Sequence, residues 1–144
     1  MGLLDAGVAK LVEKAVEKVA GGSDKKISAR THGYIDYGHA AFFLAVGLLC
    51  RKRNKAASNA ALFTSAFVVV QSLLTDYPVG VVPVISFETH GKIDAAFASA
   101  SWVIPKALGF AGTLEARIFE GNTAVEGAVV RMTDWTREHA HPEA

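Results

Sequence analysis

Residues 31–36 read T-H-G-Y-I-D and residues 89–94 read T-H-G-K-I-D, so one six-residue word recurs 58 residues later with a single change. A second pair of words, L-T-D-Y at 74–77 and M-T-D-W at 132–135, is separated by the same 58 residues. A fixed internal period is typical of a duplicated structural unit. The sequence therefore predicts two copies of one helical hairpin.

The repeat divides the chain into three parts, and the predicted fold class is all-α. We expect an amphipathic helix over residues 1–22, a four-helix domain over 31–135 with repeats at 31–77 and 89–135, and a polar tail over 136–144. The first part places apolar and charged residues on opposite helix faces. This arm can pack on the bundle, lie in a membrane interface or dock on a partner protein.

The composition favours an apolar helical protein. Hydrophobic residues make up 51% of the chain and charged residues 20%, and the mean hydropathy is +0.26. The net charge of +1 argues against a nucleic-acid partner, because phosphate binding needs a concentrated cationic surface. Cys50 is the only cysteine, and we expect it to be a small buried hydrophobe.

Two apolar stretches in the first repeat are nearly long enough to cross a bilayer. They run from Gly33 to Cys50 and from Ala56 to Leu74, and the basic sequence R-K-R-N-K at 51–55 separates them. About 20 helical residues span the hydrocarbon core, and a cationic turn suits the lipid headgroups. We therefore predict a four-helix transmembrane domain, with a tightly packed soluble bundle as the alternative.

The second repeat is more polar than the first. We expect its helices from His90 to Phe110, kinked at Pro105, and from Thr113 to Trp135. The connection at 77–88 contains two prolines, so it cannot be one continuous helix. The interior of the last helix carries charges that would be expensive in a free-standing span. They include Arg117, Glu120, Glu126 and Arg131. That helix is either shallow or shielded by partner helices.

Three words together resemble the small bacterial membrane proteins with Ser-Pro-Trp-type (SPW) repeats. They are the paired H-x-x-x-D helix starts, L-T-D-Y-P-V-G at 74–80 and A-S-W-V-I-P-K-A-L-G-F at 100–110. The likeness covers roughly residues 30–135. It implies a four-helix, multi-pass protein of the bacterial cytoplasmic (inner) membrane, and it implies no catalytic residue and no established activity.

Each repeat also places a histidine and an aspartate four residues apart, so that both share one helix face. The two pairs are His32 with Asp36 and His90 with Asp94. Thr31 and Thr89 are expected to cap the two helix starts. If the helices alternate in direction, the two pairs meet at one end of the bundle. Asp76 and Asp134 return to the same end.

Three interpretations of this cluster stay open. The first is structural, a pair of His-Asp-Thr hydrogen-bond networks that lock each hairpin. The second is ligation, in which His32 and His90 bind heme or a metal ion. The third is proton or ion handling by the cluster together with Glu126. The sequence contains no nucleophile elbow, phosphate-binding loop or H-E-x-x-H motif, so we assign no catalytic residue.

The favoured function is a non-enzymatic accessory or scaffolding subunit of a larger membrane complex, without a cofactor. It follows from the apolar connection, the charged last helix and the amphipathic arm. These surfaces have no obvious packing partner within the 144 residues. The expected partners are membrane lipid and other membrane subunits. The alternatives are a heme- or metal-binding redox protein that uses His32 and His90, and a proton- or ion-handling bundle.

Overall fold

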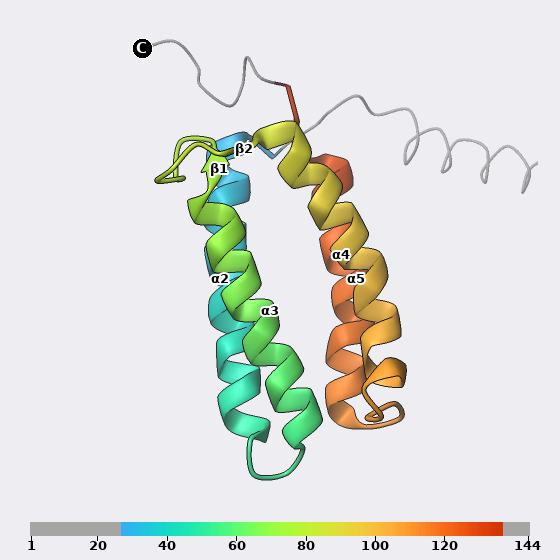
Figure 1. Cartoon of the computed structure of the whole chain (residues 1–144). Coiled ribbons are helices and arrows are strands. Elements are labelled where there is room, and N and C mark those ends of the chain that lie inside the picture. Colours follow the sequence, from blue (N-terminus) through green and yellow to red (C-terminus); the bar gives the residue numbers. More distant parts are fainter. Residues whose placement is uncertain (1–26, 137–144) are drawn as a thin grey trace, which may run out of the picture.

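The computed structural model describes residues 27–136, which form four helices and two short strands (Figure 1). The helices are α2 (Ala29–Cys50), α3 (Lys55–Leu73), α4 (Phe87–Ala107) and α5 (Leu114–Met132), and the strands are β1 (Thr75–Asp76) and β2 (Ile85–Ser86). Helix α2 packs against α3 and α4 packs against α5, which confirms the predicted pair of helical hairpins. The amphipathic arm at 1–22 and nearly all of the polar tail lie outside the described residues.

Both hairpins begin with the same serine cap. The hydroxyls of Ser28 and Ser86 accept hydrogen bonds from the backbone N–H groups of Thr31 and Thr89. The prediction that the threonines themselves cap the helices was therefore wrong. A serine three residues earlier lies where the free amides of the first turn point, and α2 and α4 consequently start before the repeated word.

Two parallel backbone pairings tie the hairpins together, and they also follow the 58-residue repeat. Thr75 pairs with Ile85 between β1 and β2, and an isolated bridge pairs Thr133 with Ile27. Each pairing joins the end of one hairpin to the start of the other, so residues 58 apart take equivalent places. We call this end, formed by residues 27–28, 75–86 and 133–135, the strand end. The opposite end, formed by the loops at 51–54 and 108–113, is the loop end (Figure 1).

The larger hydrophobic core lies toward the loop end, where the two hairpins meet. Phe43 of α2 and Phe119 of α5 are fully buried, and their rings meet edge to face with centroids 5.1 Å apart. Within the first hairpin, the Ser58 hydroxyl donates to the carbonyl oxygen of Gly47 at 2.7 Å. Cys50 is buried in this core, as predicted.

The helices of the second repeat differ from their predicted bounds. Helix α4 begins at Phe87 and ends at Ala107. Pro105 lies in its last turn, so the missing N–H falls where the helix is about to end. Helix α5 has Thr113 as its N-cap and ends at Met132, just before the bridge to the start of the described chain. The connection between α3 and β2 is not helical, as its prolines predicted.

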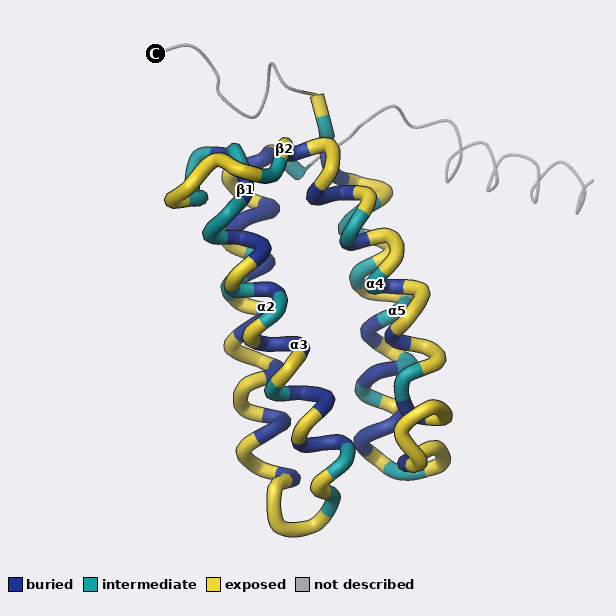
Figure 2. The backbone as a smooth tube through the Cα atoms, in the orientation of Figure 1, coloured by how far each residue is buried: buried dark blue, intermediate teal, exposed yellow. Residues whose placement is uncertain are grey.

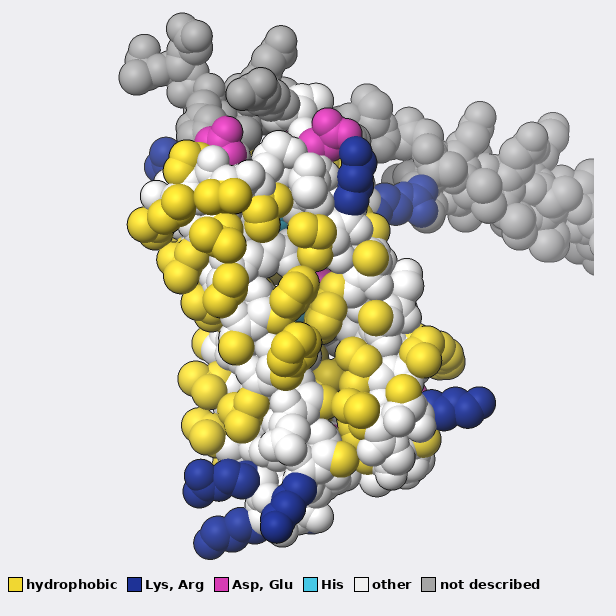
Figure 3. Space-filling model, viewed as in Figure 1, with side chains coloured by type: hydrophobic (Ala, Val, Ile, Leu, Met, Phe, Trp, Pro, Cys, Tyr) yellow, Lys and Arg dark blue, Asp and Glu magenta, His cyan; other side chains and the backbone are white. Residues whose placement is uncertain are grey.

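Helices α2 and α3 are long and apolar enough to cross a membrane, with mean hydropathies of 1.3 and 1.4 over 18 residues. Within the described range, α4 and α5 do not meet the same criterion of length and mean hydropathy. Several large apolar side chains of α2 and α3 are exposed, and Figure 2 marks the exposed positions along both helices. They include Phe42, Leu48, Leu49, Phe63 and Val70. On the face drawn in Figure 3, hydrophobic side chains occupy the middle and most charged side chains lie toward the two ends.

Candidate metal centre

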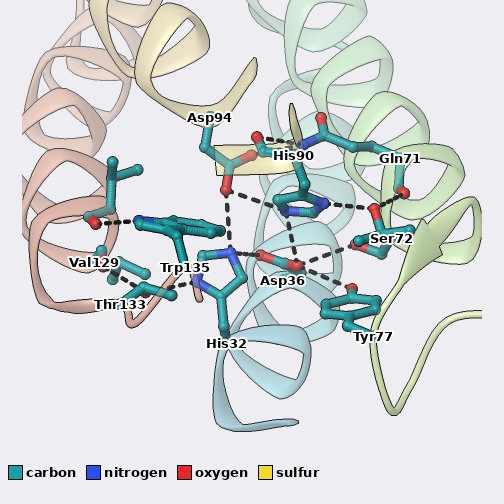
Figure 4. Close-up of polar contacts among 12 residues, drawn as sticks. His32, Asp36, Gln71, Ser72, Tyr77, His90, Asp94, Val129, Thr133 and Trp135 are labelled. Carbon is teal, nitrogen blue, oxygen red and sulfur yellow. Dashed lines mark hydrogen bonds and ion pairs between the residues drawn. The ribbon is translucent and has the colours of Figure 1, made fainter. Parts of the chain in front are cut away.

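Four buried side chains from the two repeated words meet near the strand end (Figure 4). His32 and Asp36 come from the first two turns of α2, and His90 and Asp94 come from the equivalent turns of α4. None of the four is more than 8% exposed. One nitrogen or carboxylate oxygen from each lies within 4.8 Å of the other three. The four-residue spacing turns each pair inward, and the pseudo-twofold arrangement brings the pairs together.

Each histidine faces both aspartates. His32 Nε2 lies 3.3 Å from Asp36 Oδ1 and 3.1 Å from Asp94 Oδ2. His90 Nε2 lies 3.1 Å from Asp94 Oδ2 and 3.4 Å from Asp36 Oδ2. Although these oxygens are near, the buried His90 Nε2 has no hydrogen-bond partner within the described residues. This nitrogen is therefore directed between the two carboxylates rather than along a hydrogen bond to either one.

Two threonines determine which ring nitrogen carries the hydrogen. Thr75 Oγ1 donates to a backbone carbonyl oxygen of α3 at 2.7 Å and lies 2.7 Å from His90 Nδ1. Thr133 Oγ1 donates to a carbonyl oxygen of α5 at 2.7 Å and lies 2.9 Å from His32 Nδ1. Because each hydroxyl hydrogen is already used, each Nδ1 must be the donor. The hydrogen-bond network thus directs both Nε2 atoms at the carboxylates.

Three polar side chains of the first repeat hold the carboxylates in place. Gln71 Nε2 donates to Asp94 Oδ1 at 2.7 Å. The hydroxyls of Ser72 and Tyr77 donate to Asp36 Oδ2 at 3.3 and 3.1 Å. Burial, with a smaller contribution from the Asp36 carboxylate, raises the pKa of Tyr77, so its phenol remains a donor. Outer contacts of this kind orient the ligands of metal sites.

Aromatic rings cover the cluster at the strand end. The Trp135 ring lies 4.7 Å from the His32 ring, centroid to centroid (Figure 4). The glycine that follows each histidine makes room for such a ring. A Cβ atom at Gly91 would lie 2.7 Å from the Trp135 ring, and one at Gly33 would lie 2.9 Å from the Tyr77 ring. The repeated T-H-G word therefore needs glycine for this close approach.

The other predicted candidates lie outside the cluster of four. Asp76 is in β1, and the Asp134 carboxylate accepts a hydrogen bond from the backbone N–H of Thr136 at 3.1 Å. Glu126 is partly buried on α5 and accepts a hydrogen bond from Asn122 at 2.7 Å. It lines a cavity that opens onto the cluster.

Sequence reasoning missed the two threonines, although the repeated words L-T-D-Y and M-T-D-W contained the signal. We singled out the aspartate of each word, but the threonine is the residue that faces the cluster. Thr75 and Thr133 are at most 1% exposed, whereas Asp76 and Asp134 are only partly buried. Neighbouring residues in extended backbone point to opposite sides, so only one of the two can face inward.

The cluster offers two imidazole nitrogens and two carboxylates in a site that is almost closed to water. This is a donor set for a divalent cation of the first transition series. No protein-family profile, curated protein sequence or solved structure matches this chain. The resemblance to SPW-type repeat proteins thus stays a prediction.

Proposed function

We propose that this chain is a small membrane protein whose function depends on a divalent transition-metal ion held by His32, Asp36, His90 and Asp94. The observation that carries the proposal is the convergence of their ligand atoms, all within 4.8 Å of one another, in a buried place. Buried charged groups are normally paired with each other or bound to a metal. The threonines occupy Nδ1 of each histidine, so Nε2, which faces the carboxylates, is the ring nitrogen that is available to an ion.

The spacing of the ligand atoms supports a bound ion. Nitrogen and oxygen ligands lie about 2.0–2.2 Å from zinc, so neighbouring ligands of a tetrahedral ion are about 3.3–3.6 Å apart. Both histidines lie 3.1 Å from Asp94 Oδ2, and they lie 3.3 and 3.4 Å from the two different oxygens of Asp36. One ligand atom from each residue lies within 4.8 Å of the others, so side-chain movements that bring a single Asp36 oxygen and the second nitrogen closer are needed to admit the ion.

Charge balance also supports a divalent ion. Two aspartates carry two negative charges, and burying each without compensation costs on the order of several kcal/mol. An ion of charge two neutralises them while both imidazoles stay neutral. Two nitrogens and two carboxylate oxygens suit zinc, ferrous iron or manganese.

A bare ion suits the cluster better than heme does. The centroids of the His32 and His90 rings are 5.3 Å apart, and the rings are inclined at 81°. The carboxylates of Asp36 and Asp94 occupy the space beside both Nε2 atoms. A porphyrin between the two imidazoles would have to displace them.

The predicted location is the bacterial cytoplasmic membrane, crossed by more than one helix. The apolar length of α2 and α3 and the basic turn between them support this placement. Because the ligands lie in the first two turns of α2 and α4, the metal centre would lie near one surface of the bilayer.

The competing interpretation is a structural lock without metal. In that state both histidines carry hydrogen on both nitrogens and pair with the aspartates, which balances the charge equally well. The two interpretations differ in whether an ion or protons lie between the side chains. They can be separated because only one of them requires stoichiometric metal.

The test is a metal titration of the full chain, purified in detergent and stripped with a chelator. His139 and His141 are replaced by alanine throughout, so that these two histidines do not contribute. We expect one Zn²⁺, Mn²⁺ or Fe²⁺ per chain and a higher thermal midpoint on binding, and loss of both effects in His32→Ala and His90→Ala. His39→Ala, which removes a histidine of α2 outside the cluster, is the matched control. Failure of all three ions to bind stoichiometrically would overturn the proposal.

The accessory-subunit function is a second candidate, and the exposed apolar side chains on α2 and α3 favour it. Leu49 is 84% exposed and Phe63 is 67% exposed, so lipid or a partner subunit has to cover them. Gentle detergent extraction followed by a native gel tests this candidate. Co-migration with a defined complex supports it, whereas migration as a small isolated species argues against it.

A further inference from the structure

A cavity of about 520 Å³ lies between α2 and α5 and opens onto the four-residue cluster. His32, Asp36 and Asp94 line one part of it, whereas His90 does not. The cavity therefore reaches the cluster on the side of these three residues. Most of the remaining wall is apolar. Its apolar side chains are Ile35, Phe42, Ile118, Val125, Val129 and Val130.

The pseudo-twofold arrangement supplies an internal comparison for this cavity, because the α3–α4 contact is the equivalent of the α5–α2 contact. Between α3 and α4, the Phe67 ring stacks on Phe63 and Phe97, with centroids 6.2 and 5.4 Å apart. The residues 58 positions away from these three phenylalanines are Gly121 for Phe63, Val125 for Phe67 and His39 for Phe97. All three of these counterparts line the cavity. The cavity between α2 and α5 thus lies where smaller residues replace the phenylalanine rings of the equivalent α3–α4 contact.

Two glycines widen the cavity further. A Cβ atom added to Gly38 of α2 or to Gly121 of α5 would meet no heavy atom within 4 Å. Glycine is the least favourable helix residue after proline, and both positions lie inside helices. The space over them could be filled by larger residues without a clash, and the sequence leaves it open.

The cavity wall also contains a polar atom that the protein does not satisfy. His39 Nε2 is buried and has no hydrogen-bond partner within the described part of the chain. Asn122 and Glu126 line the same cavity and are bonded to each other at 2.7 Å. Buried polar groups nearly always have a partner, which water or a bound molecule in the cavity can supply to His39 Nε2.

We propose that the cavity binds a small apolar molecule that carries an oxygen function, with the oxygen directed at His39 and the metal centre. The proposal rests on the proposed function, because the polar end of the cavity is the ion site. Cavities of about 300–1,000 Å³ with apolar walls and few polar groups are typical of small-molecule sites. An oxygen atom can also join the ion as a fifth ligand, an expansion that zinc accepts. Ring carbonyl compounds and fatty acids both have this chemistry.

Tryptophan fluorescence gives a direct readout. The chain has two tryptophans, and Trp135 contacts His32 at the polar end of the cavity. Trp102 is 63% exposed, so Trp102→Phe should leave Trp135 as a single reporter without disturbing the fold. Menadione, a two-ring quinone that quenches tryptophan fluorescence, is titrated into the zinc-loaded full chain in lipid nanodiscs. We expect saturable quenching. Displacement by decanoate shows that the same cavity also accepts acyl chains, and retention of menadione restricts the cavity to ring compounds.

Two substitutions copy the first repeat into the second and close the cavity. Gly121→Phe and Val125→Phe should each weaken menadione binding by at least about tenfold and leave zinc affinity unchanged. Gly127→Phe is the matched control, because Gly127 is also on α5 with open space over it but does not line this cavity. Quenching that does not saturate, or equal menadione affinity in all three variants, overturns the proposal. Zinc binding without menadione binding refutes only the cavity ligand, and menadione binding without zinc binding refutes only the metal centre.

Discussion

The two hairpins carry the same residues at the strand end and different residues along their lengths. The histidine, aspartate, threonine and capping serine of each repeat take equivalent places around one centre. On α3, Gln71 and Ser72 donate to the carboxylates, whereas their counterparts Val129 and Val130 on α5 line the cavity. Duplication thus accounts for the four residues of the cluster, and divergence accounts for the cavity beside them.

The largest expected effect comes from removing either histidine. His32→Ala and His90→Ala should each abolish metal binding, because each leaves two carboxylates facing one imidazole. Without the ion the buried carboxylates are left uncompensated, which costs about 3–5 kcal/mol, and we expect a loss of that size in the free energy of unfolding, measured by denaturation in mixed micelles. The two variants should be equal, since the repeats contribute equally. If either variant kept full zinc affinity, the two repeats would not contribute equally to the metal centre.

The next largest effect is expected at the two threonines. Thr75→Val and Thr133→Val remove the acceptor of each Nδ1–H, and loss of such outer contacts typically lowers metal affinity by about 10–100-fold. Thr75→Ser and Thr133→Ser keep the hydroxyl and should restore the affinity. Competition with a zinc-sensitive dye measures the zinc affinity of the valine and the serine variants. If the serine variants bind as weakly as the valine variants, the hydroxyl is not what matters.

The sequence predicted that the four residues of the cluster come together because two independent regularities agreed on them. The 58-residue period marked His32 and His90 as equivalent, and the four-residue spacing put an aspartate on the same helix face as each histidine. The helix caps were assigned wrongly because serine and threonine are both good caps and only the backbone geometry decides between them. The choice between Thr75 and Asp76 likewise depended on how the chain leaves α3, which the sequence does not encode locally.

The cavity was not predicted, although aligning the repeats already places Gly121 opposite Phe63 and Val125 opposite Phe67. Small residues alone do not predict a cavity, because neighbouring helices can move together and close it. Here the hairpins are held apart by contacts elsewhere. The backbone pairings act at the strand end, and the fully buried Phe43 and Phe119 rings act toward the loop end. Such spacing by distant contacts is visible only in three dimensions.

A smaller effect is expected where the two repeats differ around the carboxylates. Gln71→Val gives α3 the residue found on α5 and removes the donor to Asp94 Oδ1. Asp94 keeps its contacts through Oδ2, so we expect a loss of about 1 kcal/mol in the free energy of unfolding and a loss of zinc affinity near the lower end of the about 10–100-fold range. Gln71→Glu, which puts a like charge beside Asp94, should be worse than valine. Equal affinity in all three proteins would show that Gln71 does not orient the carboxylate.

The smallest effect is expected at the loop end, where a salt bridge joins the hairpins on one side only. The exposed guanidinium of Arg53 donates to the buried carboxylate of Glu115 through Nε at 2.9 Å and also through Nη2. The counterparts of this pair are Ala111 and Ala57, so the other side has no such bridge. Arg53→Met should lower the thermal midpoint by only a few degrees, because the Arg53 guanidinium is exposed, and an ion pair with one partner in water is weak and screened by salt. The difference from wild type should shrink in high salt, and zinc affinity should not change, because Arg53 lies at the opposite end from the metal centre. A change in zinc affinity would mean that the two ends of the bundle are coupled, and the centre would then depend on more than the repeated residues of the strand end.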